Sequence, residues 1–127
     1  MIGYATIGTN DVKRAVKFYD AALEPLGYKR LFEEGGWAGY GPDGKNGDGT
    51  IYLASPHNKL PATWGNGTMI AVRASSRAAV DAFHAASLAG GGLDEGAPGV
   101  RGSDTPTFYG AYARDPDGNK ICAYFKG

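Results

Sequence analysis

Two stretches of the chain, about half a chain apart, share one pattern of apolar and polar positions. Each begins with a run of alternating residues suited to a β-strand, residues 2–9 and 68–74. Each then passes a residue that caps helices well and continues with apolar residues at helical spacing. When Tyr4 is aligned with Met69, the two stretches align over their strand and helix without a gap. The pattern therefore predicts an internal duplication of a strand followed by a helix.

Three further strand-like segments follow the helix in each half. They are residues 28–34, 36–40 and 50–54 in the first half, and residues 93–95, 107–114 and 120–125 in the second. A Pro-Asp-Gly turn lies between the last two segments of both halves. The pattern predicts an α+β fold of two βαβββ units in one domain, at about residues 1–55 and 67–127 with a linker at 56–66. We expect a half-open barrel of mixed sheet, with the helices outside and a cleft between the halves.

Composition narrows the range of partners. Lysine and arginine together number 13, as do aspartate and glutamate, so the formal net charge of the 127 residues is zero and neither nucleic acid nor an anionic membrane is an expected partner. The apolar runs are shorter than the ~18 residues of a spanning helix. The N-terminus lacks the pattern of a signal peptide, and the single cysteine forms no internal disulfide. We therefore expect a cytoplasmic protein.

The paired units, together with the segments DVKRAVKFYDAALEPLGY (residues 11–28) and DPDGNKI (residues 115–121), resemble the vicinal oxygen chelate superfamily. Its members include glyoxalase I, extradiol dioxygenases and the fosfomycin- and bleomycin-resistance proteins. The resemblance implies a small organic ligand or substrate in the cleft and association as a homodimer. It leaves the reaction open, because one fold carries many activities.

In metal-dependent members of this superfamily, histidines on the first strand of each half and glutamates on the last strand bind a divalent ion such as Mn, Fe, Co, Ni or Zn. Carried onto this sequence, the four positions fall on Tyr4, Tyr52, Met69 and Cys122. None of these residues is His, Asp or Glu. The resemblance therefore implies a degenerate metal site and no metal cofactor. A Cu(I) site on Met69 and Cys122 is the weaker alternative.

The four residues have other uses in a cleft. The rings of Tyr4 and Tyr52 could stack on a ligand while their hydroxyls hydrogen-bond it, or they could pack in the core. Cys122 could be a nucleophile or redox thiol, which needs a lowered pKa and a nearby base. The sequence shows no such neighbour, and we favour a small buried apolar residue.

Four further residues are candidates for ligand binding. Arg73 lies an even number of positions from Met69, on the same strand face, where it could bind an anionic group. Arg101, together with Asp104, could orient a polar substrate from the glycine-rich loop, and Tyr109 could stack on it. Trp37 could line the other side of the cleft. For each residue, an ordinary surface or core position is the alternative.

The function predicted from the sequence is a glyoxalase/bleomycin-resistance-like protein with a degenerate metal site. It would bind a small organic molecule in an aromatic cleft. One alternative is an enzyme of the lyase, isomerase or dioxygenase type, either metal-free or metal-dependent through a non-standard site. A structural module with a filled cleft is the other.

Overall fold

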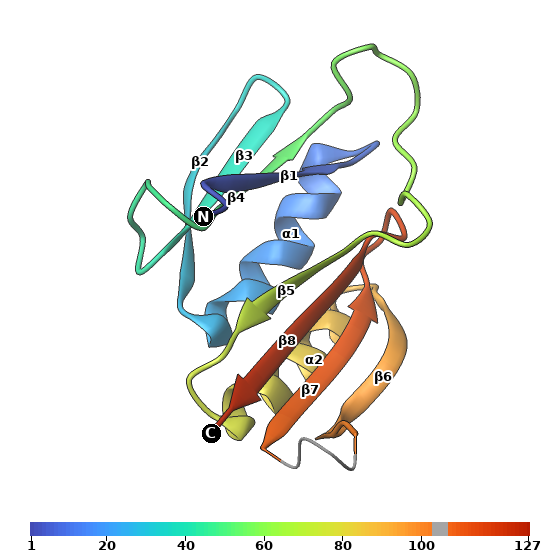
Figure 1. Ribbon diagram of the computed structural model, residues 1–127. Helices are drawn as coiled ribbons and strands as arrows, with labels where there is room; N and C mark the ends of the chain where they lie inside the picture. Colours follow the sequence, from blue (N-terminus) through green and yellow to red (C-terminus); the bar gives the residue numbers. More distant parts are fainter. Residues whose placement is uncertain (103–106) are drawn as a thin grey trace.

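The computed structural model describes residues 1–102 and 107–127, and its elements repeat one order twice. The first half contains β1 (Tyr4–Gly8), α1 (Val12–Leu23), the 3-10 turn η1 (Glu24–Leu26), β2 (Tyr28–Glu34), β3 (Trp37–Pro42) and β4 (Thr50–Ala54). The second half contains β5 (Met69–Arg73), α2 (Arg77–Ala89), β6 (Leu93–Val100), β7 (Phe108–Arg114) and β8 (Lys120–Lys126). The two predicted βαβββ units are confirmed (Figure 1).

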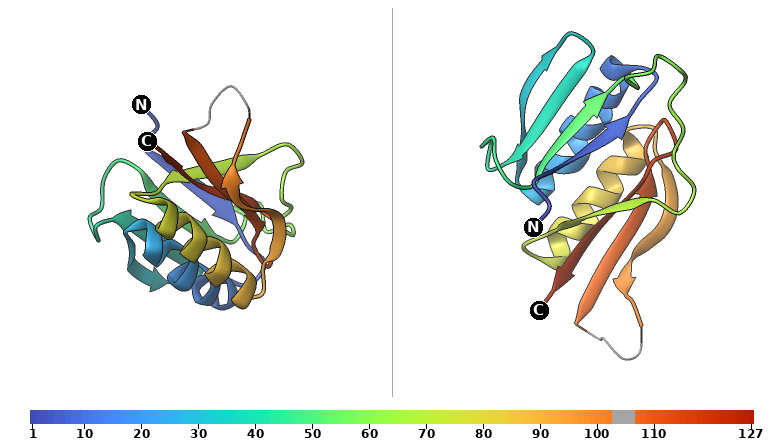
Figure 2. Two further views of the ribbon diagram at one scale, coloured as in Figure 1. Left: turned by 90° about the horizontal axis from the view of Figure 1, so that it is seen from below. Right: turned by 45° about the horizontal axis from the view of Figure 1, so that its top comes forward.

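Each half forms its own four-stranded mixed sheet. The strand orders are β1-β4-β3-β2 and β5-β8-β7-β6. In each sheet the first strand of the half runs parallel to the fourth, and the other neighbouring strands are antiparallel. The register is also repeated, since Tyr4 pairs with Thr50 and Met69 pairs with Lys120. The sheets lie beside each other and do not close into a barrel (Figure 2).

The two helices begin at side-chain caps and pack together. Asp11 accepts a hydrogen bond from the Arg14 backbone N–H, and Ser76 accepts one from that of Ala79, so each helix starts with a satisfied donor. The helices contact each other, and each covers one face of its own sheet (Figure 2). The buried face of α1 consists of Ala15, Val16, Phe18, Tyr19, Ala22 and Leu23. One core cluster joins both halves, and the opposite face of each sheet is left without a helix from the described chain.

The turn between β7 and β8 is hydrogen-bonded to the first half through the Asp115 carboxylate. Asp115 is 3% exposed. Its Oδ1 accepts the backbone N–H groups of Asp117 and Asn119, both at 2.9 Å, and its Oδ2 accepts the Tyr19 hydroxyl of α1 at 2.6 Å. Burial and then the Asp115 charge raise the pKa of Tyr19 well above its usual value, so the hydroxyl remains a donor. The carboxylate is buried but fully hydrogen-bonded.

The next acid of the same turn holds the start of α1. The Asp117 side chain is 2% exposed. Its oxygens accept the Thr9 hydroxyl at 2.5 Å, the Asn10 backbone N–H at 3.0 Å and the Arg14 guanidinium at 2.8 Å. We call the hydrogen bonds of Asp115 and Asp117 to the first half the turn clasp. Asp43, which occupies the corresponding turn of the first half, is exposed.

The length of strand β6 and the connection between β3 and β4 differ in detail from the sequence prediction. β6 runs from Leu93 to Val100, whereas the alternation predicted a strand at residues 93–95. Register shifts at Asp94, Gly96 and Gly99 break the alternation, while backbone pairing with β7 continues. Between β3 and β4, Asp43 and Gly44 form the expected turn with positive φ, but residues 45–49 lengthen the connection.

The turn clasp generates a prediction on stability. Asp117→Asn replaces an acceptor by an amide that cannot satisfy the three donors, so we expect a loss of about 1–3 kcal/mol of unfolding free energy and a melting temperature lower by roughly 3–10 °C. Asp43→Asn is the matched control and should stay within about 0.5 kcal/mol of the parent. Urea and thermal unfolding by circular dichroism measure both. Equal stability of the two variants would contradict a structural role for the clasp.

Candidate functional site

The helix-free face of the first sheet carries a cluster of aromatic rings. Tyr52 lies at its centre, with its ring centroid 5.3 Å from that of Tyr4, 6.2 Å from that of Trp37 and 6.3 Å from that of Phe32. Tyr4 and Tyr52 meet edge to face, which is a favourable ring geometry. Tyr4 is 64% exposed and Trp37 is 46% exposed. We call this cluster, Tyr4, Phe32, Trp37 and Tyr52, the aromatic face.

Gly39 makes room for these rings. It lies on β3 opposite Tyr52 of β4. A Cβ at this position would lie 2.6 Å from a ring carbon of Phe32 and 3.2 Å from one of Tyr52. Because the first distance is far below a normal contact, any side chain here would push the rings apart. The glycine therefore lets the rings of neighbouring strands meet.

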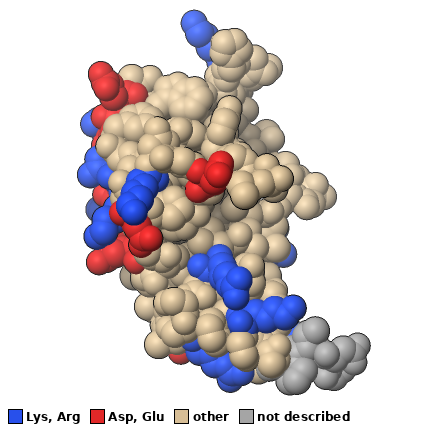
Figure 3. Space-filling model, turned by 60° about the vertical axis from the view of Figure 1, so that its left-hand side comes forward, with Lys and Arg blue, Asp and Glu red and all other residues tan. Residues whose placement is uncertain are grey.

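The helix-free face of the second sheet carries positive charge. Tyr112 lies between two cations: the Arg101 guanidinium carbon is 5.4 Å and the Lys120 Nζ 5.5 Å from its ring centroid. Alternation places Arg73 on the same side as Met69. We call Arg73, Arg101, Tyr112 and Lys120 the cationic face. Figure 3 shows basic side chains gathered beside the grey residues, below a broad area with few charges.

The two faces differ because the aromatic residues lie on opposite strands of the equivalent pairs in the two sheets. The third and fourth strands of each half pair in the same register. In the first sheet the larger ring of the central pair is on the last strand, and in the second sheet it is on the third strand. The exchanged pairs are Tyr52 with Gly39 and Ala54 with Trp37 in the first sheet, and Cys122 with Tyr112 and Tyr124 with Gly110 in the second.

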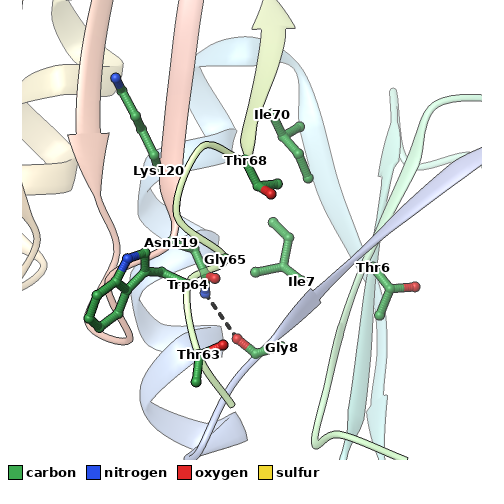
Figure 4. A pocket seen from close by; sticks show the side chains of 10 residues that line it. All are labelled: Thr6, Ile7, Gly8, Thr63, Trp64, Gly65, Thr68, Ile70, Asn119 and Lys120. Atoms are coloured by element: carbon green, nitrogen blue, oxygen red, sulfur yellow. Dashed lines mark hydrogen bonds between the residues drawn. The ribbon is translucent and has the colours of Figure 1, made fainter.

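Two cavities lie along the line where β1 and β5 approach each other. One, of about 300 Å³, is lined by residues of both first strands, including Tyr4 and Met69. The other, of about 220 Å³, lies under the linker beside Trp64, and its wall includes the Asn119 amide, which donates to the Gly8 carbonyl at 2.9 Å (Figure 4). Tyr4 of the aromatic face lines the first cavity, and Lys120 of the cationic face lines the second.

Comparison with known proteins matches this arrangement to one family. The model of the Glyoxalase/Bleomycin resistance protein/Dioxygenase superfamily matches residues 1–123. The chain belongs to this superfamily. A glyoxalase/bleomycin resistance protein from Albidiferax ferrireducens T118 is 40% identical, with 97% of each chain covered and a TM-score of 0.87. Among curated proteins, none matches the chain.

More distant structures share the fold alone. A glyoxalase/bleomycin resistance protein/dioxygenase family enzyme from Burkholderia phytofirmans PsJN is 18% identical, with 98% of this chain and 97% of that chain covered and a TM-score of 0.73. The V278E mutant of glyoxalase I from Zea mays is 21% identical, with 96% and 44% covered and a TM-score of 0.74. Neither helix of the described chain is long and apolar enough to cross a membrane.

The four positions that hold metal in metal-dependent members of the superfamily do not suit a divalent ion here. Tyr4 and Met69 line the cavity between the first strands, whereas Tyr52 and Cys122 lie one strand further out and do not line it. Their donors are two phenols, a thioether and a thiol, which is not a donor set for the divalent ions of the family. Within residues 1–102 and 107–127, no three His, Cys, Asp or Glu side chains are grouped to hold a metal.

Cys122 is buried and protonated. Its side chain is 2% exposed. Burial raises the pKa of the thiol to about 11, although a hydrogen bond with Tyr112 and the charges of Arg101 and Lys120 act in the opposite direction. A reactive cysteine needs a lowered pKa. The geometry therefore favours a small buried apolar residue over a nucleophile.

The structure divides the other candidate residues between the two sides of the sheets. Trp37, Arg73 and Arg101 belong to the helix-free faces. Tyr109 lies on the helix-covered side, where its hydroxyl donates to Asp81 of α2 at 2.6 Å and Arg77 lies over its ring at 4.9 Å. Asp104 lies outside the described residues.

Two residues of the cationic face are not among the candidates predicted from the sequence. Tyr112 and Lys120 take part in it, and the alternation of β7 and β8 would have found both. His84 of α2 is 8% exposed, with its Nε2 at 2.9 Å from Asp94 Oδ1 on β6.

The state of Cys122 predicts slow alkylation. At pH 8 a thiol with a pKa of about 11 is ionised only about one part in a thousand, so we expect native protein to react with iodoacetamide at least about 100-fold more slowly than free cysteine. Mass spectrometry over time measures the rate, and protein unfolded in urea is the control. A native rate equal to that of free cysteine would restore the nucleophile hypothesis.

Proposed function

We propose that this member of the superfamily binds a small organic molecule against the aromatic face and does so without a resident metal ion. The observation that carries the proposal is the cluster of four rings around Tyr52, two of which, Tyr4 and Trp37, are about half exposed. Rings that stay exposed next to a cavity supply the apolar, flat surface that small-molecule sites use. The cavity lined by Tyr4 and Met69 could enclose part of such a molecule.

Binding is better supported than acid–base catalysis by the tyrosines. A catalytic tyrosine needs a neighbouring group that accepts or supplies a proton. The hydroxyl of Tyr52 donates to the Asn46 Oδ1 at 3.4 Å, and an amide oxygen does not serve as a base. The enzymatic alternative therefore lacks the partner that its mechanism requires at this hydroxyl.

We also propose that two copies of the chain associate, as the resemblance to the family implies. Support comes from exposed apolar residues around the shared cavity: Ile2 is 79% exposed, Tyr4 64% and Met69 43%. Apolar groups gathered in this way mark interaction surfaces.

Association is tested with a charge placed beside the cavity. We expect sedimentation velocity to give twice the chain mass of 13.3 kDa for the parent. Ile2→Glu should shift the population toward the monomer, because a charge is costly to bury. Leu60→Glu, at a linker residue that is 63% exposed, is the matched control and should remain dimeric. A monomeric parent would overturn the proposal.

Ligand binding is tested through the two tryptophans. Trp37 belongs to the aromatic face, whereas Trp64 lies in the linker over Gly118. In a Trp64→Phe variant, the uncharged probe N-phenyl-1-naphthylamine should quench the remaining emission in a saturable manner. Tyr52→Ala in the same background should weaken binding about two- to tenfold, since loss of a stacked ring costs about 0.5–1.5 kcal/mol. Trp37→Phe, which leaves Trp64, should show little quenching.

Two results would count against the proposal. The first is equal quenching of both single-tryptophan variants, which would place the probe away from the aromatic face. The second is a stoichiometric Mn, Fe, Co, Ni or Zn in protein purified without chelator, together with a rise in melting temperature when that ion is added. The second result would support a metal site built from other residues.

A further inference from the structure

The duplicated sheets carry different charges at equivalent positions. The register that equates Tyr4 with Met69 also equates Gly8 with Arg73, and Thr50 with Lys120. The first sheet therefore has uncharged residues where the second has cations. Although the chain has no net charge, positive charge is concentrated on one of its two helix-free faces.

The positive charge of Lys120 is not neutralised by an acid of the described chain. The salt bridges between described residues involve neither Lys120 nor Arg73. Arg114, which pairs with Lys120 across the strands, donates to Glu95 at 2.9 Å and is thereby neutralised. Lys120 is also half-buried, and a charge near low-dielectric protein acts more strongly than one in open water.

Lys120 is directed toward an aromatic ring that a second cation shares. Lys120 is one of the residues that line the cavity under the linker, and Figure 4 shows the end of its side chain directed away from Asn119. Its Nζ lies 5.5 Å from the centroid of Tyr112, and Arg101 lies 5.4 Å from the same centroid. The half-buried Lys120 ammonium beside this ring therefore offers a positively charged place for an anionic group on the helix-free side.

The cationic face continues directly from the aromatic face. Tyr4 and Met69 line one cavity, and Met69 is the parallel partner of Lys120. Paired residues of neighbouring strands point to the same side of the sheet. A molecule stacked near Tyr4 can therefore extend past Met69 toward Lys120 without leaving the helix-free side.

We propose that the ligand is an organic anion: a flat apolar body on the aromatic face, and a carboxylate, sulfonate or phosphate group held at Lys120 beside Tyr112. This inference rests on the proposed function and adds the class of ligand. Lys120 supplies the charge that selects the anion, and Tyr112 orients the Lys120 ammonium through its ring. Neutral analogues would bind through the rings alone.

Two probes that differ in one group test the inference. 1-Anilinonaphthalene-8-sulfonate carries the ring system of N-phenyl-1-naphthylamine with an added sulfonate. We expect the parent protein to bind the sulfonate at least about fivefold more tightly, and 0.5 M NaCl to reduce this preference, because salt screens the charge. Probe fluorescence and Trp37 quenching in the Trp64→Phe background measure both affinities.

A matched pair of variants locates the charge. Lys120→Gln should lower the affinity for the sulfonate probe about three- to tenfold and leave that for the neutral probe unchanged. Lys17→Gln makes the same change in net charge on the exposed surface of α1 and should change neither affinity by more than about twofold. Equal melting temperatures show that both variants are folded.

The outcomes separate this inference from the proposed function. Binding of the neutral probe at Trp37 with no preference for the sulfonate overturns the inference and leaves the proposed function standing. An equal loss in Lys17→Gln and Lys120→Gln also overturns it, because a general charge effect then explains the preference. Binding of neither probe overturns both.

Discussion

The carboxylates of Asp115 and Asp117 determine how the two halves of the chain meet. The two sheets share no strand pairing, so the halves are held together by packed helices and by the turn clasp. Each carboxylate is almost entirely buried and fully supplied with donors, several of them from the first half. A buried carboxylate that lost these donors would be costly, so the turn has one favourable position. The turn before β8 is thereby tied to the residues that begin α1.

Duplication preserved the backbone and allowed the side chains to diverge. The strand register is the same in both halves, but the central ring is Tyr52 on the last strand of one half and Tyr112 on the third strand of the other. Each ring lies opposite a small residue, Gly39 in the first sheet and Cys122 in the second. At Gly39 a Cβ would lie 2.6 Å from a ring carbon of Phe32, so a larger residue there would displace the rings.

The sequence predicted elements well and spatial neighbours less well. Strands, helices and the equivalence of Tyr4 with Met69 follow from periodicity, which the backbone repeats directly. The face of the sheet on which Tyr109 lies was not predicted. A shift of one residue along a strand moves a side chain to the other face, and the tyrosine on the helix-free side is Tyr112. The cations near that ring come from separate parts of the chain, Lys120 from β8 and Arg101 from the residue after β6, so no local pattern brings them together.

A site of rings and cations, as proposed for this chain, recognises ligands differently from a metal site. A metal ion binds oxygen donors directionally, whereas stacking and ion pairing select a shape and a charge. The protonation of Cys122 is part of this change. A thiolate beside Tyr112 would cancel the charge of Lys120 and repel an anion. Since burial raises the pKa of the thiol to about 11, Cys122 is neutral at physiological pH and does not offset the charge of Lys120.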